Sequence, residues 1–151
     1  MGILNFVKDA GEKVLDAISG GNKEDKAEKL KDHINNLNLP GTDKVNIIVE
    51  DNGSAVVIGD VDTQEDKEKI LVAVGNVAGV EQVTDSVAVI QSGAESRYYT
   101  VKPGDTLSAI AKSMYGSASD YQRIFEANKP MLMDPDKIYP GQVLIIPDTR
   151  Q

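Results

Sequence analysis

Cysteine and tryptophan are absent from the 151-residue sequence, and histidine occurs once. Without cysteine the chain can form no disulfide, and it offers no thiolate as a zinc ligand or a nucleophile. A serine or cysteine nucleophile needs a histidine base beside it, so a single histidine gives such catalysis little support. Paired carboxylates of the glycosidase type remain compatible with the composition. We expect a binding protein and not an enzyme.

Basic residues are also scarce, because 16 of them face 24 acidic residues and leave a formal net charge of −8. A general nucleic-acid binder needs a basic face that displaces counterions from phosphate. The charge therefore argues against a nucleic-acid partner. It is compatible with a protein that attracts cations.

Long apolar runs are missing as well. No stretch approaches the roughly 20 apolar residues that a membrane span requires. An export signal needs roughly 7–15 uninterrupted apolar residues near the start, whereas charged residues interrupt the first apolar pattern at Lys8, Asp9, Glu12 and Lys13. We expect a cytoplasmic protein without a membrane partner.

The first 18 residues show apolar side chains at helical spacings of three and four. They are Ile3, Phe6, Val7, Ala10, Val14 and Ile18. This pattern predicts an amphipathic helix, and Gly11 predicts a break near residues 10–12 because glycine weakens a helix interior. We expect residues 1–22 to form an amphipathic segment that packs on the domain that follows.

Residues 23–90 read as a first domain with the order helix, strand, strand, helix, strand. The periodicity predicts helices over 24–36 and 64–74. Two β-rich runs, 45–50 and 54–59, flank Asn52-Gly53 and predict a hairpin. Valines in 80–89 predict the last strand.

Residues 91–96 are small and polar and predict a linker. Residues 97–151 read as a second domain with the order strand, helix, helix, strand. The predicted helices run to Tyr115 and over 118–127, and the closing strand lies in QVLIIP. The fold class that we expect is therefore α+β, with two small domains.

The second domain resembles a LysM module over 97–148. The matching residues are Tyr99-Thr100-Val101, Pro103-Gly104-Asp105-Thr106-Leu107, Ile110-Ala111, Tyr115-Gly116, Ile124, Asn128, Ile138, Pro140-Gly141-Gln142 and Leu144-Ile145-Ile146-Pro147. The resemblance implies a groove for N-acetylglucosamine polymers such as peptidoglycan. Carried onto this chain, the groove residues are Gly104, Asp105, Thr106, Leu107, Asn128, Lys129 and Ile138. The same residues also suit a turn, a helix cap and a core.

The first domain is similar to a BON domain in element order and at a set of valines and glycines. They are Val45, Val49, Gly53, Val56, Gly59, Gly75, Gly79, Val80 and Val83. Together with FVKDAGEKV, KEKILVAVGN, FEANKPML and DKIYPGQVL, the chain resembles small bacterial cytoplasmic potassium-binding proteins that join a BON domain to a LysM domain. The resemblance covers nearly the whole chain and implies K⁺ as the ligand.

A K⁺ site suits neutral oxygens such as backbone carbonyls, whereas clustered carboxylates favour Ca²⁺ or Mg²⁺. Two segments offer carbonyls outside regular pairing: residues 7–12 around Gly11, and the turn at 75–80 after a predicted helix. On the resemblance, we expect carbonyl ligands from Val7, Ala10, Glu12, Gly75, Val77 and Val80. The alternative is that Gly75-Asn76 is merely a helix cap and Gly11 an incidental bend.

Two functions follow from the sequence. The first is a cytoplasmic K⁺ sensor whose ion-bound state changes the arrangement of the domains and is read by a protein partner. The second is an envelope adaptor whose LysM domain binds peptidoglycan or another N-acetylglucosamine polymer. A glycan partner belongs to the second function alone.

Overall fold

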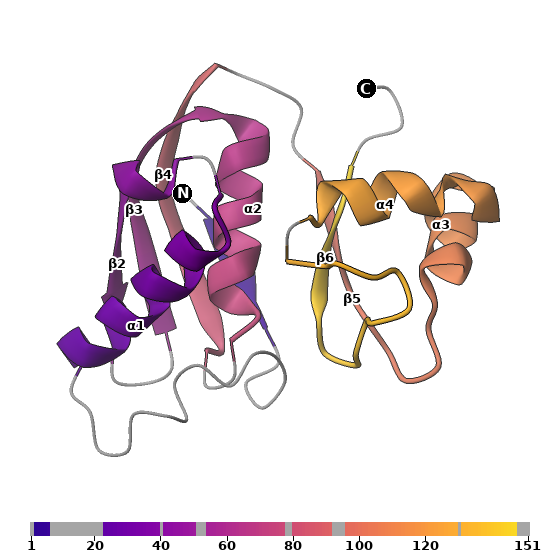
Figure 1. Cartoon of the computed structure of the whole chain (residues 1–151), viewed down its shortest axis with the longest axis horizontal. Helices are drawn as coiled ribbons and strands as arrows, with labels where there is room; N and C mark the ends of the chain where they lie inside the picture. Colours follow the sequence, from indigo (N-terminus) through magenta and orange to yellow (C-terminus); the bar gives the residue numbers. More distant parts are fainter. Residues whose placement is uncertain are drawn as a thin grey trace.

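The computed structural model describes residues 2–6, 23–39, 41–50, 54–77, 80–91, 96–129 and 131–147. These residues form two units that lie side by side along the long axis of the molecule (Figure 1). Each unit has its own sheet and helices. Residues 23–91 and 97–147 follow the two orders that the sequence predicts, and the first unit has one further strand before its first helix. The α+β prediction is therefore confirmed. Within the described ranges, no helix has both the length and the apolar character that a membrane crossing demands.

The first unit is a four-stranded sheet with two helices on one face (Figure 1). Its elements are β1 (Gly2–Asn5), α1 (Lys23–Asn36), a 3₁₀ turn (Thr42–Lys44), β2 (Val45–Val49), β3 (Ser54–Thr63), α2 (Gln64–Gly75) and β4 (Gln82–Gln91). The strand order is β1-β4-β3-β2. Strands β2 and β3 form the expected antiparallel hairpin, and β4 returns parallel to β3 after the α2 crossover.

Alternating burial explains why these segments pair as strands. In β2, Val45, Ile47 and Val49 are buried while the residues between them are exposed, which places one face of the strand against the helices. Thr63 begins α2 by accepting a hydrogen bond from the Asp66 N–H at 3.2 Å. The apolar side of α2 then closes the core over the sheet.

The prediction of a helix over the first 18 residues is wrong for residues 2–5. Gly2–Asn5 is a strand that pairs antiparallel with β4, with Leu4 opposite Val83. The open edge of β4 offers backbone N–H and C=O groups to a neighbouring strand, and this pairing outweighs a local helical spacing of apolar residues. The rest of the expected helix, including Gly11, lies outside the described residues.

The second unit is a two-stranded antiparallel sheet with helices packed on one side. Its elements are β5 (Arg97–Thr100), α3 (Leu107–Tyr115), a 3₁₀ turn (Ala118–Asp120), α4 (Tyr121–Ala127) and β6 (Val143–Ile146). The Thr106 hydroxyl accepts the Ala109 N–H at 3.1 Å and begins α3. Gly116, with a φ of 86°, ends it in the left-handed region.

The two units are in direct contact. Helix α2 packs against β6, and the Val143 side chain belongs to the hydrophobic core of the first unit. At the other end of α2, the buried Glu68 carboxylate accepts the Ser96 N–H at 2.7 Å. The second unit is thus held on α2 near both ends of the helix.

Candidate functional site

The turn that follows α2 brings three of the six predicted ion ligands together. Gly75 is the last residue of α2, and Asn76 caps the helix by donating its N–H to the Val72 carbonyl at 2.9 Å. The Val80 N–H donates to the Val77 carbonyl at 3.0 Å and closes the turn. Gly75, Val77 and Val80 therefore lie within one short backbone loop.

Phe6, the residue directly after β1, contacts both the start and the end of this turn. The Phe6 N–H donates to the Glu81 carbonyl at 2.8 Å, next to Val80. The Phe6 ring lies against Gly75 so closely that a Cβ at this position would stand 2.0–2.2 Å from the ring atoms. Glycine is therefore needed at position 75 for the ring to pack as it does.

The other three predicted ligands, Val7, Ala10 and Glu12, lie outside the described residues. Val7 is bonded directly to Phe6 in the chain. Phe6 therefore brings the chain to the turn directly before Val7, the first of the predicted N-terminal ligands.

The chemistry of the turn suits a large monovalent cation, which can be bound by neutral oxygen ligands. Its candidate ligands are neutral carbonyl oxygens at the C-terminus of α2, where the helix dipole favours positive charge. The Val77 carbonyl already accepts one N–H, and its second lone pair can still face an ion. In the described ranges, no group of three or more acidic or histidine side chains could hold a metal ion. The donor set fits K⁺ better than a divalent ion.

The predicted glycan groove begins at the loop before α3. The Asp105 carboxylate accepts the Tyr99 hydroxyl at 2.6 Å and the Lys102 N–H at 2.9 Å. These two hydrogen bonds lower the pKa of Asp105 below its ordinary value. Gly104, with a φ of 87°, turns the chain in the left-handed region. Asp105 and Gly104 thus shape the loop from which Thr106 caps α3.

The remaining groove residues are also engaged in the fold. Asn128 is buried, and its amide donates to the Ile124 and Ile145 carbonyls at 2.7 and 3.0 Å and accepts the Ile145 N–H at 2.8 Å. Leu107 is a core residue. Lys129 pairs with Glu126 and lies over the Phe125 ring, and Ile138 packs against the core. Asn128 therefore holds α4 to β6, and both N–H groups of its amide are engaged within the fold.

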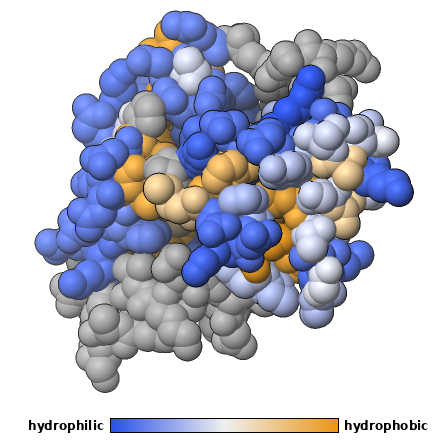
Figure 2. All heavy atoms as spheres, turned by 45° about the vertical axis from the view of Figure 1, so that its right-hand side comes forward, coloured by the Kyte–Doolittle hydropathy of each residue, from blue (hydrophilic) through white to orange (hydrophobic). Residues whose placement is uncertain are grey.

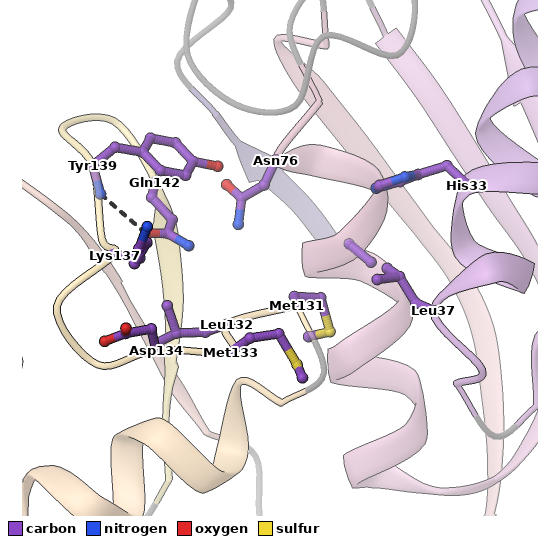
Figure 3. A pocket seen from close by; sticks show the side chains of 11 residues that line it. His33, Leu37, Asn76, Met131, Leu132, Met133, Asp134, Lys137, Tyr139 and Gln142 are labelled. Atoms are coloured by element: carbon purple, nitrogen blue, oxygen red, sulfur yellow. Dashed lines mark hydrogen bonds between the residues drawn. The ribbon is translucent and has the colours of Figure 1, made fainter.

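Sequence reasoning missed a cavity of about 410 Å³ between the two units (Figure 3). One wall comes from α1 and α2 and the other from the loop before β6; the lining residues are His33, Leu37, Ala73, Asn76, Met131, Leu132, Met133, Asp134, Lys137, Tyr139 and Gln142. Apolar surface gathers toward the middle of the face that Figure 2 shows, inside a largely hydrophilic rim. Because the lining comes from segments far apart in the sequence, no local pattern could have found it.

Comparisons with known proteins match both halves of the chain. The family model of the BON domain matches residues 22–91, and that of the LysM domain matches residues 99–147. The potassium binding protein Kbp of Escherichia coli O6:H1 is 58% identical over 149 residues, which cover 98% of this chain and 99% of that protein. An uncharacterized protein of Deinococcus radiodurans is 32% identical over 111 residues, which cover 66% of this chain and 43% of that protein.

Proposed function

The chain belongs to the family of the potassium binding protein Kbp, and from this premise we propose that it binds K⁺ through backbone carbonyl oxygens. The proposed ligands are the carbonyls of Val7, Ala10, Glu12, Gly75, Val77 and Val80. In this proposal the N-terminal segment, residues 1–22, meets the turn of a BON domain that spans 23–90. A linker at 91–96 leads to the LysM domain, residues 97–151.

The observation that carries the proposal is the position of Phe6. Its ring packs on Gly75 and its N–H binds the Glu81 carbonyl, so the chain reaches both ends of the turn immediately before Val7. This contact supports the convergence of residues 7–12 and 75–80 on one ion. A site made of both segments would tie the N-terminal segment to the rest of the first domain when K⁺ is bound.

Selectivity in this proposal comes from the ligand type. Neutral carbonyl dipoles can replace the hydration shell of a large monovalent ion, whereas Mg²⁺ gives up its waters reluctantly and Ca²⁺ prefers carboxylates. The net charge of −8 attracts cations in general but does not choose among them.

We assign the protein the role of a cytoplasmic sensor without a catalytic step of its own. Ion binding would favour one arrangement of the BON and LysM domains, and a protein partner would recognise that arrangement. The role requires no nucleic acid and no membrane.

Isothermal titration of the salt-free protein with KCl, and with NaCl at the same ionic strength, tests the proposal. We expect a saturable one-site response to K⁺ and a much weaker response to Na⁺. K⁺ at 100 times its Kd should also stabilise the fold by about 2.7 kcal/mol and raise the Tm. Equal and weak responses to both salts would mean that the ions merely screen the negative charge, and would refute a K⁺ site.

The alternative function is N-acetylglucosamine binding by the LysM domain, and the match to that domain favours it. The burial of Asn128 and Leu107 within the domain speaks against both as sugar contacts. Titration with chitin oligomers separates the alternatives, because glycan binding would proceed in the absence of K⁺.

A further inference from the structure

Two asparagine side chains occupy the edge of β6 that faces away from β5. Asn128, from the same unit, binds the N–H and C=O of Ile145. Asn76, from the first unit, binds Val143 in the same way: its amide donates to the Val143 carbonyl at 2.8 Å and accepts the Val143 N–H at 2.9 Å. The backbone groups on the outer edge of β6 are therefore hydrogen-bonded by one asparagine of their own unit and by one asparagine of the other unit.

The contact of Asn76 with Val143 fixes orientation as well as distance. A planar amide that donates one hydrogen bond and accepts another from the same residue resembles one rung of a strand pair. Two simultaneous bonds hold the amide plane, and hence the end of α2, in one pose on β6. A single hydrogen bond or an apolar contact would allow the units to rotate against each other.

Asn76 stands between two of the proposed ion ligands, Gly75 and Val77. Each of these carbonyls belongs to a rigid, planar peptide unit, and the Gly75 carbonyl shares its plane with the Asn76 nitrogen. The Gly75 carbonyl lies in the peptide plane directly before the Asn76 Cα, and the Val77 carbonyl lies in the second peptide plane after it. An ion that draws both carbonyls inward therefore restrains the short backbone segment that carries Asn76. The direction of the Asn76 Cα–Cβ bond is restrained with it, and so is the approach of β6.

We propose that Asn76 is the positioning residue that couples the ion site to the docking of the LysM domain. The inference rests on the proposed function, since it needs an ion at the turn. A bound ion holds the turn in the shape that presents the Asn76 amide to Val143. By thermodynamic reciprocity, docking of β6 on Asn76 strengthens ion binding by the same factor by which the ion strengthens docking.

The contacts on α2 predict how the units move. Glu68 binds the Ser96 N–H eight residues before Asn76, and eight residues of helix span about 12 Å. Loss of the hydrogen bonds between Asn76 and Val143 therefore leaves this end of the contact held by apolar packing, while the hydrogen bond of Glu68 at the other end stays in place. The expected motion is a swing about Ser96 and not a complete separation.

The absence of cysteine allows a clean measurement of this swing. Asn46→Cys on β2 and Ser113→Cys on α3 place two labels at exposed positions on opposite units (Figure 1). Energy transfer between fluorescent labels then reports the arrangement, and calorimetry on the same protein reports K⁺ binding. The test variant is Asn76→Ala, and its matched control is Asn35→Ala, which removes an exposed asparagine from α1.

We expect energy transfer in the parent protein and in Asn35→Ala to change with K⁺ and to saturate with the calorimetric binding curve. Asn76→Ala should still bind K⁺, with affinity reduced roughly 5- to 150-fold, the usual range of coupling between sites. Its energy transfer should no longer respond to K⁺, even at saturation.

Val143→Pro tests the same contact from the other unit. It removes the N–H that Asn76 accepts and leaves the turn unchanged, and this N–H does not pair with β5 because it points to Asn76. Proline is tolerated where the missing N–H faces away from the sheet. We expect Val143→Pro to behave like Asn76→Ala, while tyrosine fluorescence confirms that the second unit is folded.

The outcomes separate the inference from its premise. If the parent protein does not bind K⁺, the proposed function fails and the coupling with it. If the parent binds K⁺ but Asn76→Ala keeps the full response of energy transfer, the coupling alone is refuted. A folded Asn76→Ala that binds no K⁺ at all would place Asn76 in the ion site itself, and would also overturn a coupling role.

Discussion

A single added methyl group at Gly75 tests the packing of the N-terminal strand on the ion turn. In Gly75→Ala the new Cβ would lie 2.0–2.2 Å from three atoms of the Phe6 ring, well inside any allowed contact. Phe6 is 7% exposed, so its ring cannot turn away without disturbing the core. The substitution should therefore displace Phe6, and with it the chain that leads to Val7.

The expected change in the free energy of unfolding follows from two opposing effects. Alanine is favoured over glycine in a helix by about 1 kcal/mol, and the backbone of Gly75 is helical. Overpacking of a filled core costs about 1–3 kcal/mol. We expect a net loss of up to about 2 kcal/mol in the free energy of unfolding, together with weaker K⁺ binding because the N-terminal ligands are displaced.

A double-mutant cycle with Phe6→Leu identifies the cause. Leucine lacks the ring atoms that collide with the new Cβ, so Gly75→Ala should become neutral or stabilising in the Phe6→Leu background. The coupling energy between the two positions should then fall within the 0.5–3 kcal/mol that contacting residues show. Urea unfolding followed by far-UV circular dichroism measures the helices and strands of both units together. All five tyrosines lie within 98–139, so tyrosine fluorescence reports the second unit separately. A Gly75→Ala protein with unchanged stability and unchanged K⁺ affinity would refute the packing argument.

Three further predictions concern the elements that hold the site. Asn128→Ala leaves buried partners on α4 and β6 unsatisfied and should destabilise the second unit by about 2–4 kcal/mol, measured by tyrosine fluorescence in urea; a loss below about 0.5 kcal/mol would contradict it. Thr63→Ala removes the acceptor for the Asp66 N–H and should cost the first unit about 1 kcal/mol, with circular dichroism as the readout. The Tyr99 hydroxyl lowers the pKa of Asp105, so this carboxylate stabilises the fold above its unfolded pKa of about 4 and the contribution is lost as pH falls further. An NMR titration should show a higher Asp105 pKa in Tyr99→Phe, and an unchanged pKa would contradict the assigned cause.

Local patterns in the sequence were sufficient for most of the element order. Two β-rich runs identified β2 and β3, and Asn52-Gly53 between them identified their hairpin. Asp105 and Thr106 both suited a cap before α3, and Thr106 is the residue whose hydroxyl accepts the Ala109 N–H. These features depend on neighbours in the chain, and the sequence displays them directly.

Features that depend on distant partners were not predictable. The strand β1 exists because β4 offers an open edge about 80 residues further along, a fact that the helical spacing of Ile3 and Phe6 does not contain. Asn76 had the sequence signature of a helix cap, and its amide finds Val143 at a separation of 67 residues. Asn128 was assigned to a glycan groove because the resemblance to a LysM module places it there. Its burial and its hydrogen bonds to Ile124 and Ile145 depend on packing that the sequence does not display.

The measurement that most directly tests the central claim is the chemical shift of individual carbonyl carbons during a K⁺ titration. With uniformly ¹³C-labelled protein, the account predicts large and saturable shifts at Gly75, Val77 and Val80, and at Val7, Ala10 and Glu12. NaCl at the same ionic strength should leave these six carbonyls nearly unchanged. Small shifts spread over the acidic surface, equal for both salts and absent from the turn, would contradict a carbonyl site for K⁺.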